Sequence, residues 1–204
     1  MTAIWTELAQ RAGINLDPRQ HAQLEQYLEL LLRANAAMNL TRISNLDDAR
    51  VQHVGDSLTL LPFLPAGEFC LADVGSGGGV PGMPLAIARP NAQVILIEAT
   101  NKKADFLRYA AAALQLSNVR IIPRRAEEVA RGELREHCDV VAARALAPMR
   151  LLGEWCLPLA KVRGVVLAMK GPKIAEELPA SLHTLRVLGG GVPAVHPANL
   201  PGAA

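Results

Sequence analysis

The chain has 204 residues, of which 50% are hydrophobic and 3% aromatic, and its formal net charge is +2. This length and composition allow one domain of ordinary size with an aliphatic core. Its three cysteines form no CxxC or Cys/His cluster, which argues against a disulfide framework and against a metal site. The sequence lacks a signal-peptide pattern and an apolar run long enough for a membrane span, so we expect a cytoplasmic protein without a membrane partner.

The charge is divided unevenly along the chain. Residues 1–100 carry six Lys and Arg against ten Asp and Glu, whereas residues 101–204 carry 15 against nine. A polyanionic partner would therefore meet the second half, and a solvated surface of mixed charge is the alternative.

Residues 1–66 have the pattern of a helical cap. Asp17 followed by Pro18 is a typical helix start, and Asn45 or Asp47 can cap a later helix. The apolar residues at helical spacing are Trp5, Leu8, Ala9, Leu24, Tyr27, Leu28, Leu31, Leu32, Val51, Val54, Leu58 and Leu61.

From residue 67 onward, short apolar runs alternate with helical patterns. We expect strands at 69–74, 92–99, 119–123, 138–144 and 164–170. We expect helices at 84–90, 102–116, 126–134 and 149–160. This alternation predicts a parallel, doubly wound α/β sheet in a domain covering 67–190, with one more strand over 182–190 and a loose tail over 191–204. The cap and the sheet are expected to form one integrated domain.

A glycine-rich segment, "DVGSGGGVPG" at 73–82, joins the first expected strand to the next helix. Gly75, Gly77 and Gly79 let the chain turn sharply and let a ligand approach the backbone, beyond the carboxyl ends of the strands. Glu98 ends the second strand, where a carboxylate can accept hydrogen bonds from both hydroxyls of a ribose.

Two kinds of nucleotide ligand compete for this loop. The spacing of its glycines also fits the GxGxxG pattern of dinucleotide-binding proteins, a weak signal alone. Asp73 and Pro81 argue against that ligand, because a carboxylate at the strand end would repel a pyrophosphate. The same carboxylate suits a cation such as the α-amino group of S-adenosylmethionine. A turn that only packs strand against helix is the structural alternative.

Seven short segments then occur in an order typical of one family. They are "NLT" at 39–41, "HVGDSL" at 53–58, "DVGSGGGVPGMPLAI" at 73–87, "EATNKKADFLR" at 98–108, "RAEE" at 125–128, "ARA" at 143–145 and "MKG" at 169–171. On these segments the chain resembles the ribosomal RNA small-subunit methyltransferase G family, formerly called glucose-inhibited division protein B. The resemblance runs from about residue 31 to residue 171. Gln52 and Ala34 depart from the family pattern, and its final apolar strand is not recognisable here.

The resemblance implies a Rossmann-like class I methyltransferase fold and a monomer that uses S-adenosylmethionine as its cofactor. The implied reaction methylates N7 of one guanine, position 527 in the usual numbering, in 16S rRNA of the small ribosomal subunit. The cofactor site is expected to include Asp73, Gly75, Gly77, Gly79, Val80, Glu98, Ala126, Glu127 and Arg144. The positions expected to be catalytic are Asn39, His53, Arg144 and Lys170, and those expected to contact RNA are Arg125, Lys170, Lys102 and Lys103.

The residues after the fourth strand agree with this chemistry. N7 of guanine carries an unprotonated lone pair, so catalysis needs alignment and electrostatic placement rather than a general base. The sequence shows no Asn-Pro-Pro-Tyr motif there, and Cys138 lies at the wrong end of the strand for a nucleophile. Arg144 can instead contact phosphate, guanine O6 or the cofactor. Asp56, three residues after His53, is expected to orient that imidazole.

Other functions remain as alternatives at this point. One is a class I methyltransferase that acts on a small molecule or a protein. Another is a non-catalytic RNA-binding or ribosome-assembly module, and a third is an NAD-linked oxidoreductase. A basic face beside the glycine loop favours an RNA acceptor, whereas an apolar acceptor pocket would favour a small molecule.

Overall fold

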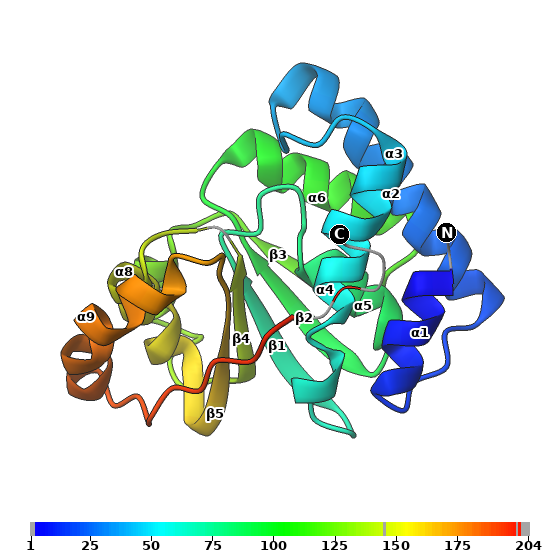
Figure 1. The fold of residues 1–204 in the computed structure, drawn as a ribbon. Helices are drawn as coiled ribbons and strands as arrows, with labels where there is room; N and C mark the ends of the chain where they lie inside the picture. Colours follow the sequence, from blue (N-terminus) through cyan, green and yellow to red (C-terminus); the bar gives the residue numbers. More distant parts are fainter. Residues whose placement is uncertain (1–2, 145, 199, 201–204) are drawn as a thin grey trace.

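A computed structural model describes residues 3–144, 146–198 and 200. Its centre is a parallel five-stranded sheet in the order β3-β2-β1-β4-β5 (Figure 1). The strands are β1 (Phe69–Val74), β2 (Ala92–Ile97), β3 (Val119–Ile122), β4 (Cys138–Arg144) and β5 (Ala160–Met169). The strand order reverses between β1 and β4, which places the switch point of the sheet at the carboxyl ends of these two strands.

The strand β1 lies at the centre of the sheet, and all six of its residues are buried. Its side chains alternate between two cores, with Leu71 in one and Ala72 in the other. A strand that is buried on both faces reads as a continuous apolar run, which is why its position was predicted correctly from "FCLADV".

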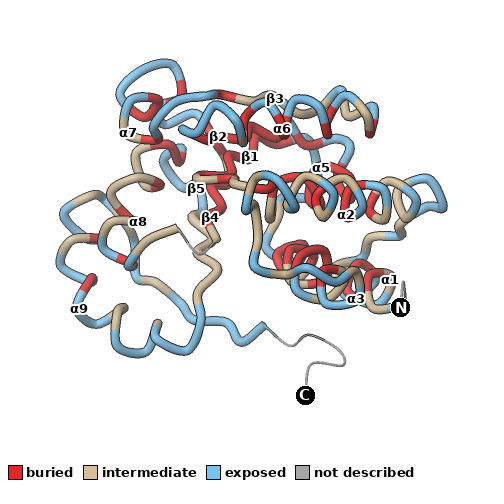
Figure 2. The backbone as a smooth tube through the Cα atoms, turned by 90° about the horizontal axis from the view of Figure 1, so that it is seen from above, coloured by how far each residue is buried: buried red, intermediate tan, exposed pale blue. Residues whose placement is uncertain are grey.

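Helices cover both faces of the sheet (Figures 1 and 2). The helices α5 (Gly82–Ala88) and α6 (Asn101–Ala113) pack on one face, and α7 (Ala126–Val129), α8 (Met149–Cys156) and α9 (Ile174–Val187) pack on the other. The helix predicted at 126–134 ends earlier than expected, because α7 stops at Val129 and turns follow it.

The amino-terminal helices pack outside α5 and share its core. They are α1 (Ala3–Arg11), α2 (Pro18–Met38), α3 (Leu46–Ala49) and α4 (Asp56–Leu58), with a π-helical turn at Arg50–Gly55 between the last two. The helix α2 begins after Asp17, as the Asp17-Pro18 pair predicts, and Asp17 also forms a reciprocal capping box with Gln20. Trp5, Tyr27 and Leu58 are fully buried, so the cap is packed onto the sheet domain through a continuous apolar core.

The predicted strand over residues 182–190 is wrong, because these residues belong mostly to α9. Ser181 and Leu185 are buried one helical turn apart, and Leu185 packs closely against Gly153 of α8. Pro179 inside the helix interrupted the pattern that would have shown this amphipathic face. Residues 191–198 and 200 form no helix or strand, and their path crosses toward the cap, where the His196 ring lies 4.9 Å from that of Phe63 (Figure 1).

Candidate functional site

The glycine loop joins β1 to α5 at the switch point of the sheet. Gly75, Gly77 and Gly79 all have positive φ angles, of 71°, 55° and 98°. The amide of Gly75 donates to the Ile97 carbonyl of β2 at 2.9 Å, which ties the loop to the neighbouring strand. The loop therefore has a defined shape. Gly77 is half-buried and the position of its absent Cβ is open, so a ligand can approach the backbone there.

Asp73 lies under this loop and is completely buried. Its Oδ2 accepts a hydrogen bond from the Gly82 amide at 2.9 Å, whereas its Oδ1 has no hydrogen-bond partner among the described residues. Burial raises the pKa of Asp73 to about 7, and the Gly82 hydrogen bond counteracts this shift only in part. A buried carboxylate oxygen without a partner is costly, so this site favours a cationic ligand that can donate a hydrogen bond.

Glu98 directly follows β2 and is nearly buried. Its Oε2 accepts from the Gly77 amide at 2.9 Å and its Oε1 accepts from the Thr100 amide at 2.7 Å. These bonds fix the carboxylate beside the glycine loop. Each oxygen keeps a second lone pair, so Glu98 can still accept hydrogen bonds from a diol.

Helix α2 supports the glycine loop from the cap. The Tyr27 hydroxyl is buried and donates to the Gly78 carbonyl at 2.9 Å. A Cβ on Gly78 would come within 2.7 Å of the Leu31 side chain, also on α2. From the sequence, Tyr27 could be assigned only to the core face of its helix, because no local pattern indicates its contact with Gly78, 51 residues away.

Arg144, the last residue of β4, connects the sheet to the cap. Its guanidinium donates to the Gln52 carbonyl at 2.7 Å and lies 3.3 Å from the Asp56 carboxylate. It is also close enough to Asp73 for its charge to lower the pKa of that carboxyl group. Asp56 was expected to orient His53. Its carboxylate contacts Arg144 instead, and the Arg144 guanidinium in turn lies beside His53.

His53 lies in the π-helical turn with its ring held at both nitrogens. Its Nδ1 lies 3.4 Å from the Arg144 guanidinium, and its Nε2 lies 2.9 Å from Thr41 Oγ1. Burial, together with the Arg144 charge, lowers the pKa of His53 to about 4. Arginine only donates, so Nδ1 must be the acceptor of a neutral ring, and Nε2 carries the proton toward Thr41.

Lys170 follows β5 and is only 12% exposed. Its Nζ lies 2.6 Å from Glu177 of α9 and donates to the Ala147 carbonyl at 2.8 Å. The structure therefore gives this lysine two partners within the chain. Glu177 could not be identified from the sequence, because the pattern weakens after residue 173.

Among the described residues, the other predicted positions make no side-chain hydrogen bond to this cluster. Asn39 ends α2 in a left-handed conformation, and Ala126 and Glu127 begin α7. Val80 leads into a cis peptide bond with Pro81. The exposed cations Lys102 and Arg125 and the half-buried Lys103 lie at the starts of the helices that follow β2 and β3.

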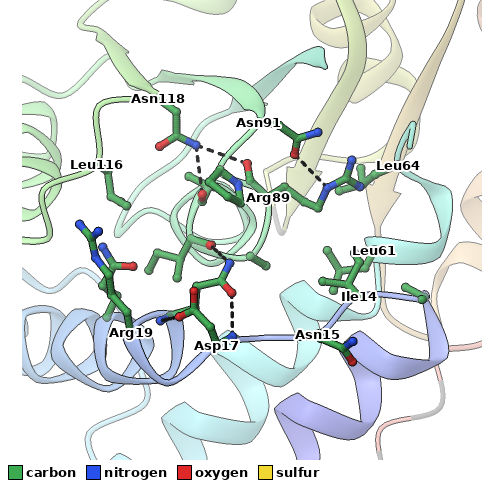
Figure 3. A pocket seen from close by; sticks show the side chains of 18 of the residues that line it. Ile14, Asn15, Asp17, Arg19, Leu61, Leu64, Arg89, Asn91, Leu116 and Asn118 are labelled. Atoms are coloured by element: carbon green, nitrogen blue, oxygen red, sulfur yellow. Dashed lines mark hydrogen bonds between the residues drawn. The ribbon is translucent and has the colours of Figure 1, made fainter. Parts of the chain in front are cut away.

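A cavity of about 720 Å³ lies at the opposite end of the sheet (Figure 3). The Asn118 amide that faces it donates to the carbonyls of Ala86 and Ala92, and the Arg89 guanidinium donates to the Pro65 carbonyl. These side chains hold loops together. We therefore place the candidate site at the glycine loop rather than in this cavity.

Among residues 3–144, 146–198 and 200, no three His, Cys, Asp or Glu side chains gather as they would around a metal ion. The helices in the same part of the chain lack the combination of length and apolar character that crossing a bilayer requires.

Comparison with solved structures identifies the fold. The crystal structure of M. jannaschii TYW2 in complex with AdoMet matches with a TM-score of 0.52 at 19% identity, covering 72% of this chain and 64% of that one. The parallel sheet with its covering helices is a Rossmann-like class I methyltransferase fold with an N-terminal helical cap, as predicted.

Sequence comparison identifies the family. A family model described as rRNA small subunit methyltransferase G matches residues 20–198. The ribosomal RNA small subunit methyltransferase G of Chloroflexus aggregans is 42% identical over 191 residues, or 93% of this chain and 80% of that protein. The protein of the same name from Lactobacillus johnsonii is 40% identical over 199 residues, or 96% of this chain and 83% of the relative. This chain belongs to the rRNA small subunit methyltransferase G family.

Proposed function

We propose that this protein transfers a methyl group from S-adenosylmethionine to N7 of a guanine in 16S rRNA of the small ribosomal subunit. The observation that carries this proposal is the buried Oδ1 of Asp73 beneath the glycine loop, which has no hydrogen-bond partner in the part of the chain that the structure describes. It fits the α-amino group of S-adenosylmethionine, and it would repel the pyrophosphate of a dinucleotide. Membership of the methyltransferase family supports the same cofactor.

The residues around the loop divide the binding of this cofactor among them. Asp73 would accept from the ammonium group and Glu98 from the ribose hydroxyls, while Gly77, whose Cβ position is open, leaves room for backbone contact. Ala126 and Glu127 begin α7 after β3 and would border the adenine. S-adenosylmethionine would supply an electrophilic methyl group at this position.

The chain needs no general base for the proposed transfer, because N7 of guanine already carries a lone pair. His53 is suited to a positioning task, since its lowered pKa keeps it neutral and its Nδ1 accepts from Arg144. Arg144, held by Asp56 and the Gln52 carbonyl, can orient the cofactor, guanine O6 or a phosphate. Asn39 ends α2 two residues before Thr41 and could offer its amide to the target base.

Three cationic side chains on one edge of the sheet support an RNA acceptor. Lys102, Lys103 and Arg125 follow the carboxyl ends of β2 and β3, on the same edge as the glycine loop. Phosphate contacts of this kind would place the RNA across the site without reading its sequence.

The test is methyl transfer from labelled S-adenosylmethionine to small ribosomal subunits that lack the modification, with the acceptor nucleotide mapped. Label on a single guanine N7 of 16S rRNA is the expected result. Confirmed cofactor binding without transfer to subunits or to 16S rRNA would overturn the RNA acceptor, and would favour a small molecule or a protein in its place.

A further inference from the structure

Two anchors flank residues 146–148, which lead into α8. Arg144 fixes one end to the cap through Gln52 and Asp56. At the other end the Lys170 ammonium donates to the Ala147 carbonyl, and the Glu177 carboxylate accepts from the Met149 amide at 2.9 Å.

Lys170 and Glu177 form one unit at that second end. Their charged groups lie 2.6 Å apart, with side chains that are 12% and 27% exposed. The hydrogen bond from Lys170 lowers the pKa of Glu177, so the carboxylate is ionised and accepts strongly. Besides pairing with each other, the two side chains bind backbone groups: Lys170 binds the Ala147 carbonyl and Glu177 binds the Met149 amide. The pair therefore restrains the position of this backbone.

Between the two anchors, Leu146 lies directly against the glycine loop. A Cβ added to Gly75 would come within 2.2 Å of Leu146 Cδ1, so the leucine methyl occupies the space that any larger residue at position 75 would fill. Leu146 therefore forms a wall of the loop, and its place depends on how the segment is anchored.

We propose that Glu177 is a positioning residue for the cofactor site, which acts through Lys170 and Met149 on the segment at 146–149 and, through Leu146, on the glycine loop. The inference rests on the proposed function only in naming S-adenosylmethionine as the ligand that binds more tightly when the glycine loop is held in place. The predicted role of Lys170 in RNA contact becomes secondary here, because both of its polar contacts lie within the chain.

The first test uses the cofactor-free protein and its E177A and E177Q variants. Amide hydrogen exchange is followed at Leu146, Met149 and residues 75–79. We expect faster exchange at these amides in E177A and a smaller increase in E177Q, which keeps an acceptor for Met149. The matched control is E176Q, at the exposed neighbouring position of α9, which should exchange like the wild type. Unchanged exchange at 75–79 in E177A would overturn the proposal.

The second test measures the Kd of S-adenosylmethionine by calorimetry, well below the melting temperature of each variant. We expect E177A to raise this Kd about tenfold, the scale of one charge-assisted hydrogen bond. The exchanged pair K170E/E177K restores the ion pair, but it can neither donate to Ala147 nor accept from Met149. We therefore expect it to recover thermal stability without recovering affinity.

A role of Glu177 in stability alone gives a different pattern. The melting temperature of E177A would then fall while its Kd and loop exchange stayed at wild-type values, and K170E/E177K would bind S-adenosylmethionine with the wild-type Kd. This result would overturn the inference. Failure of the wild type to bind S-adenosylmethionine would instead overturn the proposed cofactor, and the exchange experiment would still decide the role of Glu177.

Discussion

The buried carboxyl group of Asp73 couples the proposed cofactor site to pH. Its pKa is raised to about 7 by burial, whereas a bound ammonium group would favour the ionised form. We expect the affinity for S-adenosylmethionine to fall as the pH drops below 7, and binding near pH 6.5 to release a proton. Calorimetry in buffers of different ionisation enthalpy measures this release, and D73N should abolish it. Equal proton release by D73N would assign the effect to another group.

The same carboxyl group has a predictable effect on the stability of the protein without ligand. Because its pKa is about 7 when folded and near 4 when unfolded, the folded state binds more protons between these values. Its contribution to the free energy of unfolding should therefore decrease as the pH rises from 4 to 7. Urea unfolding of wild type and D73N across this range tests it. A difference between the two proteins that stays constant with pH would contradict the raised pKa.

His53 is expected to stay neutral throughout the physiological range. Its pKa of about 4 lies below the ordinary value, so its contribution to stability is lost only as the pH falls from about 6.5 through 4. An NMR titration of the imidazole protons, assigned with H53Q, should show no inflection near pH 6.5. A titration of His53 with an inflection near pH 6.5 would show that its Nδ1 does not accept a hydrogen bond from Arg144 in the way the structure indicates.

At the scale of elements, α2 is coupled to the glycine loop by one hydroxyl group. The Tyr27 hydroxyl satisfies the buried Gly78 carbonyl, so Y27F should cost about 1–3 kcal/mol of the free energy of unfolding. The affinity for S-adenosylmethionine should fall with it, because the loop loses a support. The matched control is Y109F on α6, where the tyrosine is 62% exposed and the same change should have little effect. Equal losses in both variants would show that the contact with Gly78 contributes nothing.

Most elements could be predicted from local sequence, because their cause is local. The run "FCLADV" indicates a strand buried on both faces, and Asp17 followed by Pro18 indicates a helix start. The helix α9 was missed because Pro179 interrupts its pattern and its buried residues are few. The glycine loop could be placed by its motif, since its shape depends on glycines adjacent in the chain.

The supports of the site could not be predicted in this way. Tyr27 reaches Gly78 across 51 residues, and Glu177 reaches Met149 across 28. Such contacts depend on how elements pack, and nothing in the local pattern around either side chain differs from that of an ordinary helix. The orientation of Asp56 toward Arg144 has the same origin, since it required the cap and β4 to meet.

At the scale of the whole molecule, the basic second half of the sequence should determine how RNA approaches. Lys102, Lys103 and Arg125 lie after β2 and β3 on the glycine-loop edge, whereas Arg19 lines the cavity at the opposite edge. Each phosphate contact releases counterions, so its loss lowers the slope of log Kd against log salt concentration by about one. We expect K102A, K103A and R125A each to weaken binding of 16S rRNA and to reduce this slope.

The charge-matched control for these variants is R19A, which removes one positive charge from the far edge of the molecule. We expect the slope of log Kd against log salt concentration for R19A, measured by filter binding, to equal that of the wild type. K170A should also keep the wild-type slope, because Lys170 is paired with Glu177 and donates to Ala147. A reduced slope for R19A would mean that overall charge, rather than the edge beside the glycine loop, attracts the RNA. A reduced slope for K170A would return Lys170 to the phosphate path and show that its pair with Glu177 opens when RNA binds.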